Sequence, residues 1–133
     1  MKTREFSASI EELDRVSAFV EEELEQADCG MRAQMQIAVA LEEMFVNVAH
    51  YAYADGKGSV EVGVGVTDGV AAIRLTDSGM PFDPLAKADP DIRLKAEERG
   101  IGGLGIFMVK KTMDDVKYER VDGRNVFTMF KKI

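Results

Sequence analysis

Apolar residues recur at helical spacing along the stretch from Met31 to about Tyr53. They fall on one face, and they are Ile37, Leu41, Phe45, Val48 and Ala52. Because each residue advances about 100° around a helix, this spacing predicts a helix whose face packs on the core. Glu43 and Asn47 lie one turn apart and nearly opposite that face. The solvated side of an amphipathic helix would explain an isolated pair of this kind.

The residues around this pair are less polar than a solvated face requires. Val39, Ala40 and Val46 share its side of the helix. Such a composition suits a helix that is covered on both sides. We therefore expect cover over the ridge that carries Glu43 and Asn47.

A shorter helix is predicted to begin after Ser9. The sequence Ser9-Ile10-Glu11-Glu12 has the form of a capping box, in which the Ser9 hydroxyl and the Glu12 carboxylate satisfy free N–H groups. The expected apolar stripe consists of Ile10, Leu13, Val16 or Ser17, Val20 and Leu24. The weak alternation from Glu5 to Ser9 indicates a first strand, and Asp28-Cys29-Gly30 ends the helix.

Strict alternation follows the turn at residues 55–58. Val60, Val62, Val64 and Val66 mark a half-buried strand, and Asp68-Gly69 separates it from a second strand at residues 70–76 by the spacing of a tight hairpin. Asp77 shares the parity of Ala71, Ile73 and Leu75. A carboxylate on the core side of a buried strand requires a hydrogen-bond donor. Alternatively, Asp77 turns outward and caps the loop that follows.

A long irregular connection runs from Ser78 to about Arg99, with a short helix expected near Pro90 to Glu98. Connections of this length are usually functional loops. This one ends in Gly100-Ile101-Gly102-Gly103-Leu104-Gly105, before an expected helix from Ile106 to Met113. Glycines before a helix can cradle a phosphate through backbone N–H groups, although many such turns bind none. Residues 115–121 and 125–131 predict a closing hairpin around Asp122-Gly123.

Composition narrows the class of function. The chain has 133 residues, of which 46% are hydrophobic, which suits one domain spanning residues 1–133. The net charge of −7 argues against nucleic-acid binding but permits a basic protein partner. Because Cys29 and His50 are each single, we expect no disulfide, Cys/His metal cluster or Cys–His catalytic pair. No apolar run approaches the roughly 18 residues of a membrane span, so we expect a cytoplasmic protein without membrane contact.

Three motifs stand in order along the chain. They are Glu43-x-x-x-Asn47 on a helix, Asp77-Ser78-Gly79-Met80-Pro81 after a strand, and the glycine run at residues 100–105. They resemble the N box and the two glycine boxes of the GHKL superfamily of histidine kinase-like ATP-binding domains. Residues 40–47, with Tyr51-Ala52-Tyr53 and residues 77–84, resemble more closely its anti-sigma factor serine/threonine kinase branch. The resemblance implies the Bergerat fold, an α+β two-layer sandwich whose mixed, mainly antiparallel sheet is covered on one face by helices, with ATP under a lid.

The resemblance also implies roles for individual residues. Asn47 would hold the Mg²⁺ that bridges the phosphates, and Glu43 would act as general base on the attacking hydroxyl. Asp77 would accept from the adenine amino group. The other implied nucleotide-binding residues are Gly79, Pro81, Gly100, Gly102, Gly103, Leu104 and Gly105. Arg99 resembles a lid arginine that stabilises the transferring phosphoryl group, and an ordinary surface arginine is the alternative.

Two positions depart from the family pattern. Tyr51 stands where many relatives have His, and the Thr expected in the last strand is replaced around Val126, with Thr128 nearby. Neither departure affects Glu43 or Asn47.

The function implied is that of an ATP-binding serine/threonine protein kinase that takes part in partner switching. It would phosphorylate an anti-sigma factor antagonist of the STAS type and bind a sigma factor or a similar partner, and it could form a homodimer. The alternative is a non-catalytic module of the same fold that holds ATP and inhibits its partner. Glu43 favours the kinase, because a passive binder needs no base there. A detached histidine-kinase catalytic domain is disfavoured by the Met80-Pro81 form of the first glycine box.

Overall fold

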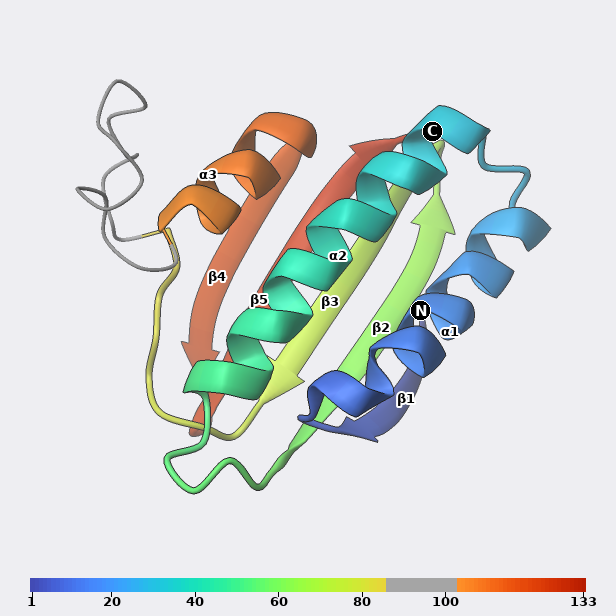
Figure 1. Ribbon diagram of the computed structural model, residues 1–133. Helices are drawn as coiled ribbons and strands as arrows, with labels where there is room; N and C mark the ends of the chain where they lie inside the picture. Colours follow the sequence, from blue (N-terminus) through green and yellow to red (C-terminus); the bar gives the residue numbers. More distant parts are fainter. Residues whose placement is uncertain (86–102) are drawn as a thin grey trace.

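The computed structural model describes residues 1–85 and 103–133, which form a sheet covered on one face by helices (Figure 1). The strands are β1 (Lys2–Ser7), β2 (Ser59–Thr67), β3 (Val70–Asp77), β4 (Asp115–Val121) and β5 (Arg124–Lys132). The helices are the 3₁₀ turn η1 (Ile10–Glu12), α1 (Leu13–Gln26), α2 (Met31–Tyr51) and α3 (Gly103–Thr112). This arrangement confirms the expected α+β two-layer architecture.

The sheet has five strands in the order β1-β2-β3-β5-β4, and each neighbouring pair is antiparallel. Both predicted hairpins are confirmed. In the β2–β3 turn, Asp68 and Gly69 have φ values of 52° and 76°, and in the β4–β5 turn Asp122 and Gly123 have 49° and 77°. Positive φ at both central residues is typical of the type I′ turn, whose twist matches that of the paired strands. The two turns therefore fix the register of β2 against β3 and of β4 against β5.

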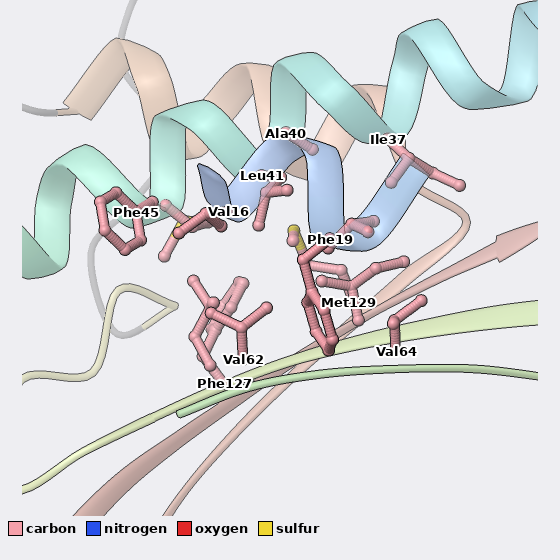
Figure 2. Packing of buried hydrophobic residues seen from close by; sticks show 14 of the residues in the cluster. Val16, Phe19, Ile37, Ala40, Leu41, Phe45, Val62, Val64, Phe127 and Met129 are labelled. Atoms are coloured by element: carbon pink, nitrogen blue, oxygen red, sulfur yellow. The ribbon is translucent and has the colours of Figure 1, made fainter. Parts of the chain in front are cut away.

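The core lies between the sheet and the helices (Figure 2). On the sheet it is formed by every second residue of the central strands, including Val62, Val64, Ile73, Leu75, Phe127 and Met129. On the helices it is formed by Val16, Phe19, Val20, Leu24, Ile37, Leu41 and Phe45. Full burial of each large apolar side chain contributes about 1.5–3 kcal/mol. The predicted core face of α2 is thus confirmed. The predicted stripe of α1 is wrong at Ile10, which is 47% exposed, and it omitted Phe19.

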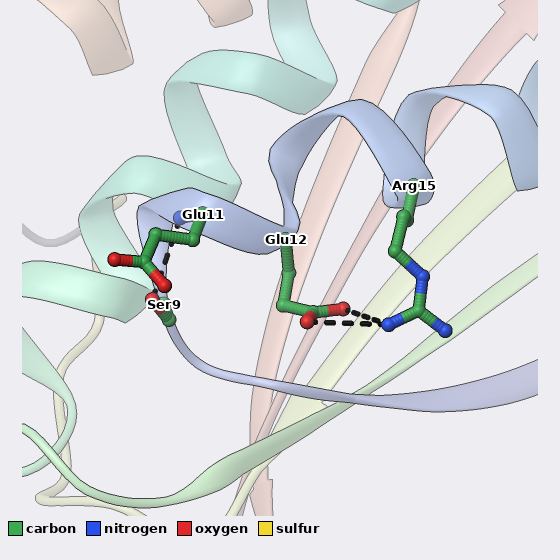
Figure 3. Close-up of polar contacts among 4 residues, drawn as sticks. All are labelled: Ser9, Glu11, Glu12 and Arg15. Atoms are coloured by element: carbon green, nitrogen blue, oxygen red, sulfur yellow. Dashed lines mark hydrogen bonds and ion pairs between the residues drawn. The ribbon is translucent and has the colours of Figure 1, made fainter.

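The start of the first helix differs from the expected capping box (Figure 3). The Ser9 hydroxyl accepts from the backbone N–H of Glu11 at 3.3 Å. The Glu12 carboxylate does not reach back to Ser9, because it accepts from Arg15 one turn later at 2.9 Å. The serine therefore caps the helix as expected, but the reciprocal half of the box is replaced by an exposed ion pair.

The outward face of α2 is less covered than its composition indicated. Ala40 is buried, but Val39 is 54% exposed and Met35 is 63% exposed. The expectation of cover on both sides of this helix is therefore wrong at Val39. No helix in the described ranges is long and apolar enough to cross a membrane.

Three helix or strand boundaries differ from those that the sequence predicted. β1 occupies Lys2–Ser7 rather than residues 5–9, and α2 ends at Tyr51. α3 begins at Gly103, so Gly103 and Gly105 lie inside its first turn rather than before the helix. The α2 and α3 helices pack on each other, and this contact helps a glycine-rich turn to become helical despite its low intrinsic propensity. The short helix expected at residues 90–98 lies outside the described residues, as do Arg99, Gly100 and Gly102.

Candidate functional site

A pocket opens where the last turns of α2 meet the ends of β3, β4 and β5. It is a partly open hollow, and the space within it, including solvent at its mouth, measures about 390 Å³. α2 contributes Met44, Asn47, Val48, Tyr51 and Ala52, and the strands contribute Asp77, Tyr118, Asn125 and Phe127. Phe82 and Pro84, which follow β3, complete the lining. The walls are mainly apolar with a few converging polar groups, as in sites for small organic ligands.

Asp77 ends β3 on the core side, as its parity predicted. It is 6% exposed. Its Oδ1 accepts from the Asn125 side-chain amide at 2.9 Å and from the backbone N–H of Gly79 at 2.9 Å. The required donor is therefore present, and the carboxylate also caps the turn that follows. Within residues 1–85 and 103–133, no group donates to the other oxygen, Oδ2.

Asn125 is a site residue that the sequence did not single out. It is 5% exposed, and it lies directly opposite Asp77 in the β3–β5 register. Its Nδ2 donates to Asp77 and to the backbone carbonyl of Met80 at 2.7 Å. Its Oδ1 accepts from the Tyr118 hydroxyl at 2.6 Å and from the backbone N–H of Phe82 at 3.3 Å. The parity of Asn125 with Phe127 and Met129 was the signal that could have placed it on the core side.

The neighbouring positions of β5 lie on the opposite face of the sheet. Val126 pairs with Thr76 and lines a separate hollow that also contains Glu61 and Arg74. Thr128 has the same parity as Val126. The residue of β5 that faces the pocket at this level is therefore Asn125, and neither Val126 nor Thr128 does so.

Glu43 and Asn47 lie on the ridge of α2 that faces α3 and the pocket. Asn47 lines the pocket, and its Nδ2 donates to the backbone carbonyl of Glu43 at 3.0 Å. This bond turns the side-chain carbonyl oxygen away from the helix backbone. The carboxylate of Glu43 lies against the first turn of α3, because a methyl group built on Gly105 would stand 2.4 Å from Glu43 Oε2. The structure thus places Asn47 and Asp77 in one pocket. Glu43 lies beside this pocket, against Gly105.

The first glycine box crosses the end of α2 at close range. A Cβ on Gly79 would stand 2.1 Å from the backbone carbonyl oxygen of Ala52, and that oxygen accepts from the N–H of Met80 at 2.8 Å. Arg120 donates to the carbonyl of Gly79 at 2.9 Å. Only glycine leaves room for this crossing. Pro81 is exposed and does not line the pocket, unlike Phe82 and Pro84.

Tyr51 lines the pocket and is 42% exposed. Gly103 and Leu104 begin α3. In the described part of the chain, no group of three His, Cys, Asp or Glu side chains is placed to hold a metal ion. A metal at this site would therefore depend on Asn47 and on ligands that a nucleotide brings.

The fold is a helix-covered antiparallel sheet in which a polar strand end faces a helix ridge, and comparison with known proteins identifies the family. The chain belongs to the family of histidine kinase-like ATPase domains, whose model matches residues 6–131. The resemblance to the GHKL superfamily is therefore confirmed.

Curated relatives carry the name serine-protein kinase RsbW. The protein from Oceanobacillus iheyensis is 30% identical over 91 residues, which cover 61% of this chain and 54% of that protein. A Bacillus cereus protein is 27% identical over 92 residues, covering 66% of this chain and 58% of that protein. The matched region spans little more than half the length of these relatives.

Solved structures show the same fold. The structure of the RsbU and RsbW domains of Rv1364c from Mycobacterium tuberculosis matches 99% of this chain and 32% of that chain, with a TM-score of 0.67 and 16% identity. The catalytic domain of histidine kinase ThkA matches 99% of this chain and 96% of its own, with a TM-score of 0.58 and 16% identity. The SiaB–SiaC complex from Pseudomonas aeruginosa matches 98% of this chain and 89% of that chain, with a TM-score of 0.57 and 18% identity.

Proposed function

We propose that this chain binds Mg-ATP and transfers the γ-phosphoryl group to a serine or threonine of an anti-sigma factor antagonist of the STAS type. It would also bind a sigma factor or a similar partner in a partner-switching circuit. The observation that carries the proposal is that the Asp77 carboxylate and the Asn47 amide line one pocket, with Glu43 one turn earlier in α2. The names of the curated relatives support the kinase class.

Asp77 is suited to recognise the base. A buried, ionised carboxylate with one oxygen already bonded presents its second oxygen only as an acceptor. The exocyclic amino group of adenine is a matching donor. The apolar lining from Met44, Val48 and Phe127 suits the faces of a purine ring.

Asn47 is suited to hold the metal. Its Nδ2 is engaged with the helix backbone, which leaves the hard carbonyl oxygen for Mg²⁺. Magnesium usually takes few protein ligands and completes its shell with phosphate oxygens and water, which fits a site without a carboxylate cluster in the described residues. When bound, Mg²⁺ would neutralise charge on the phosphates.

Glu43 is suited to act as the general base. Its carboxylate is half-buried at the first turn of α3, near where helix N–H groups favour the phosphates of a nucleotide. It would take the proton of the substrate hydroxyl as that oxygen attacks the γ-phosphorus and ADP leaves. The glycines from Gly103 to Gly105 would line the phosphates, joined by Gly100 and Gly102. Arg99 would stabilise the transferring charge, as the family resemblance implies.

Incubation with labelled ATP and candidate antagonist proteins tests the proposal. We expect label on a serine or threonine of one antagonist in the presence of Mg²⁺, and none after chelation. Calorimetry with Mg-ADP provides the parallel measurement of binding. No detectable binding at millimolar nucleotide would refute the proposed site. Binding without transfer to any antagonist would instead support the passive module of the same fold.

A further inference from the structure

The Asn125 amide has all of its hydrogen-bonding groups engaged by the protein. Nδ2 has two hydrogens, and it donates to Asp77 Oδ1 and to the Met80 carbonyl. Oδ1 has two lone pairs, and it accepts from the Tyr118 hydroxyl and the Phe82 N–H. An asparagine side chain offers two donors and two acceptor positions, so none remains for a ligand. Asn125 therefore lines the pocket without a hydrogen bond to offer to its occupant.

The four bonds fix the orientation of the amide. A 180° flip would point the oxygen at Asp77 Oδ1 and at the Met80 carbonyl, two acceptors that cannot donate to it. It would also point the NH₂ group at the Phe82 N–H, which is a donor. Only one orientation satisfies all partners, and burial makes each lost bond costly because the unpaired group stays desolvated.

We propose that Asn125 is a positioning residue that sets the base selectivity of the pocket. It holds Oδ1 of Asp77 and so leaves Oδ2 as the oxygen that meets the ligand. Where the carboxylate oxygen lies opposite C6, it accepts from the amino group of a 6-amino purine but repels the oxygen of a 6-oxo purine, which is itself an acceptor. This inference rests on the proposed nucleotide site, and it adds that the choice between amino and oxo bases depends on a residue that does not touch the base.

The same amide connects the carboxylate to the walls of the pocket. Through Met80 and Phe82 it holds the segment after β3, and Phe82 stands in the lining. Through Tyr118 it joins β4, where Arg120 also donates to the Gly79 carbonyl. Rotation of the Asp77 carboxylate would break its bonds to Asn125 on β5 and to Gly79 in the segment after β3.

The test compares the affinities of ADP and IDP by calorimetry in the presence of Mg²⁺. The two nucleotides carry identical phosphates and ribose. They differ in the base, where IDP has an oxo group at C6 and a hydrogen on N1 in place of the amino group and bare N1 of ADP. We expect the wild-type chain to prefer ADP. Asn125→Ala should lower the ADP/IDP affinity ratio by about tenfold, because Asp77 loses the side-chain donor to Oδ1 and keeps only the Gly79 N–H.

Tyr118→Phe is the second variant, because it removes one hydroxyl and leaves the buried amide in place. It should lower the same ratio by about threefold, since one of the bonds that fix the amide is lost. Val126→Ala is the matched control on the other face of β5, and its ratio should equal that of the wild type. Circular dichroism confirms that each variant is folded, and Tyr118→Phe decides the outcome if Asn125→Ala does not fold.

Each result has one interpretation. A fall in the ratio in the folded Asn125 or Tyr118 variants, with no change in Val126→Ala, supports the inference. Equal weakening of ADP and IDP would overturn it, because Asn125 would then only maintain packing. An unchanged ratio would overturn it as well. Absence of ADP binding to the wild type would refute the proposed nucleotide site itself, which is a distinct failure.

Discussion

Because the Glu43 carboxylate lies against Gly105, we predict that a methyl group added at Gly105 slows phosphoryl transfer without lowering the stability of the fold. In Gly105→Ala the new Cβ would stand 2.4 Å from Glu43 Oε2 and 3.4 Å from its Cδ. An ordinary contact requires about 3.4 Å, so the carboxylate must retreat by roughly 1 Å. The clashing atom is the far end of a flexible side chain, and alanine favours a helix over glycine by about 1 kcal/mol. The free energy of unfolding should therefore stay unchanged or rise by up to about 1 kcal/mol.

Phosphoryl transfer should respond in the opposite direction. Displacement of a reacting group by about 1 Å can reduce the rate by on the order of 10²-fold. We expect Gly105→Ala to transfer phosphate to its antagonist about 10–100-fold more slowly while its thermal midpoint is kept or raised. Met108→Ala is the control, because it places alanine on the exposed side of the same helix. A wild-type transfer rate in a folded Gly105→Ala protein would refute the placement of Glu43 as the base at this contact.

Three further substitutions test the remaining roles. Asp77→Asn should weaken ADP binding by about 1–3 kcal/mol in calorimetry, because the buried acceptor loses its charge. Glu43→Gln should leave ADP affinity nearly intact and slow transfer by about 10²–10⁴-fold, the usual contribution of a positioned base, and wild-type transfer would disprove the assignment. Asn47→Ala should weaken Mg-ADP binding and transfer together, because the metal acts in both. We expect Mg²⁺ to strengthen ADP binding to the wild type but not to Asn47→Ala. If Mg²⁺ strengthens ADP binding to Asn47→Ala as much as to the wild type, Asn47 is not a metal ligand.

Local patterns predicted most of the fold. The alternating valines of β2 and the two Asp-Gly turns depend on neighbours in sequence, and their elements formed where expected. The core face of α2 was readable because its periodicity covers several turns. The start of α3 was not, because packing against α2 outweighs the low helix propensity of Gly103 and Gly105.

The site was only partly readable for a related reason. Asp77 could be placed on the core side from parity within its own strand. Parity within β5 could have placed Asn125 on the core side, but its position opposite Asp77 depends on the register between β3 and β5, which pairs residues far apart in sequence and cannot be inferred from either strand alone. The same limit explains why the sequence pointed to Val126 for the polar residue of the last strand. A shift of one residue in β5 exchanges the two faces of the sheet, so Val126 lies on the face away from the pocket.

The composition of the pocket lining also links ligand binding to the folding of distant parts of the chain. Its walls come from α2, from the end of β3 and from the closing β4–β5 hairpin. A nucleotide would therefore bind only molecules in which the last hairpin has already joined the sheet through β3. Ligand at 100 times its dissociation constant stabilises such molecules by about 2.7 kcal/mol over those that have not completed the sheet. Nucleotide binding would in this way keep the β4–β5 hairpin docked on the sheet.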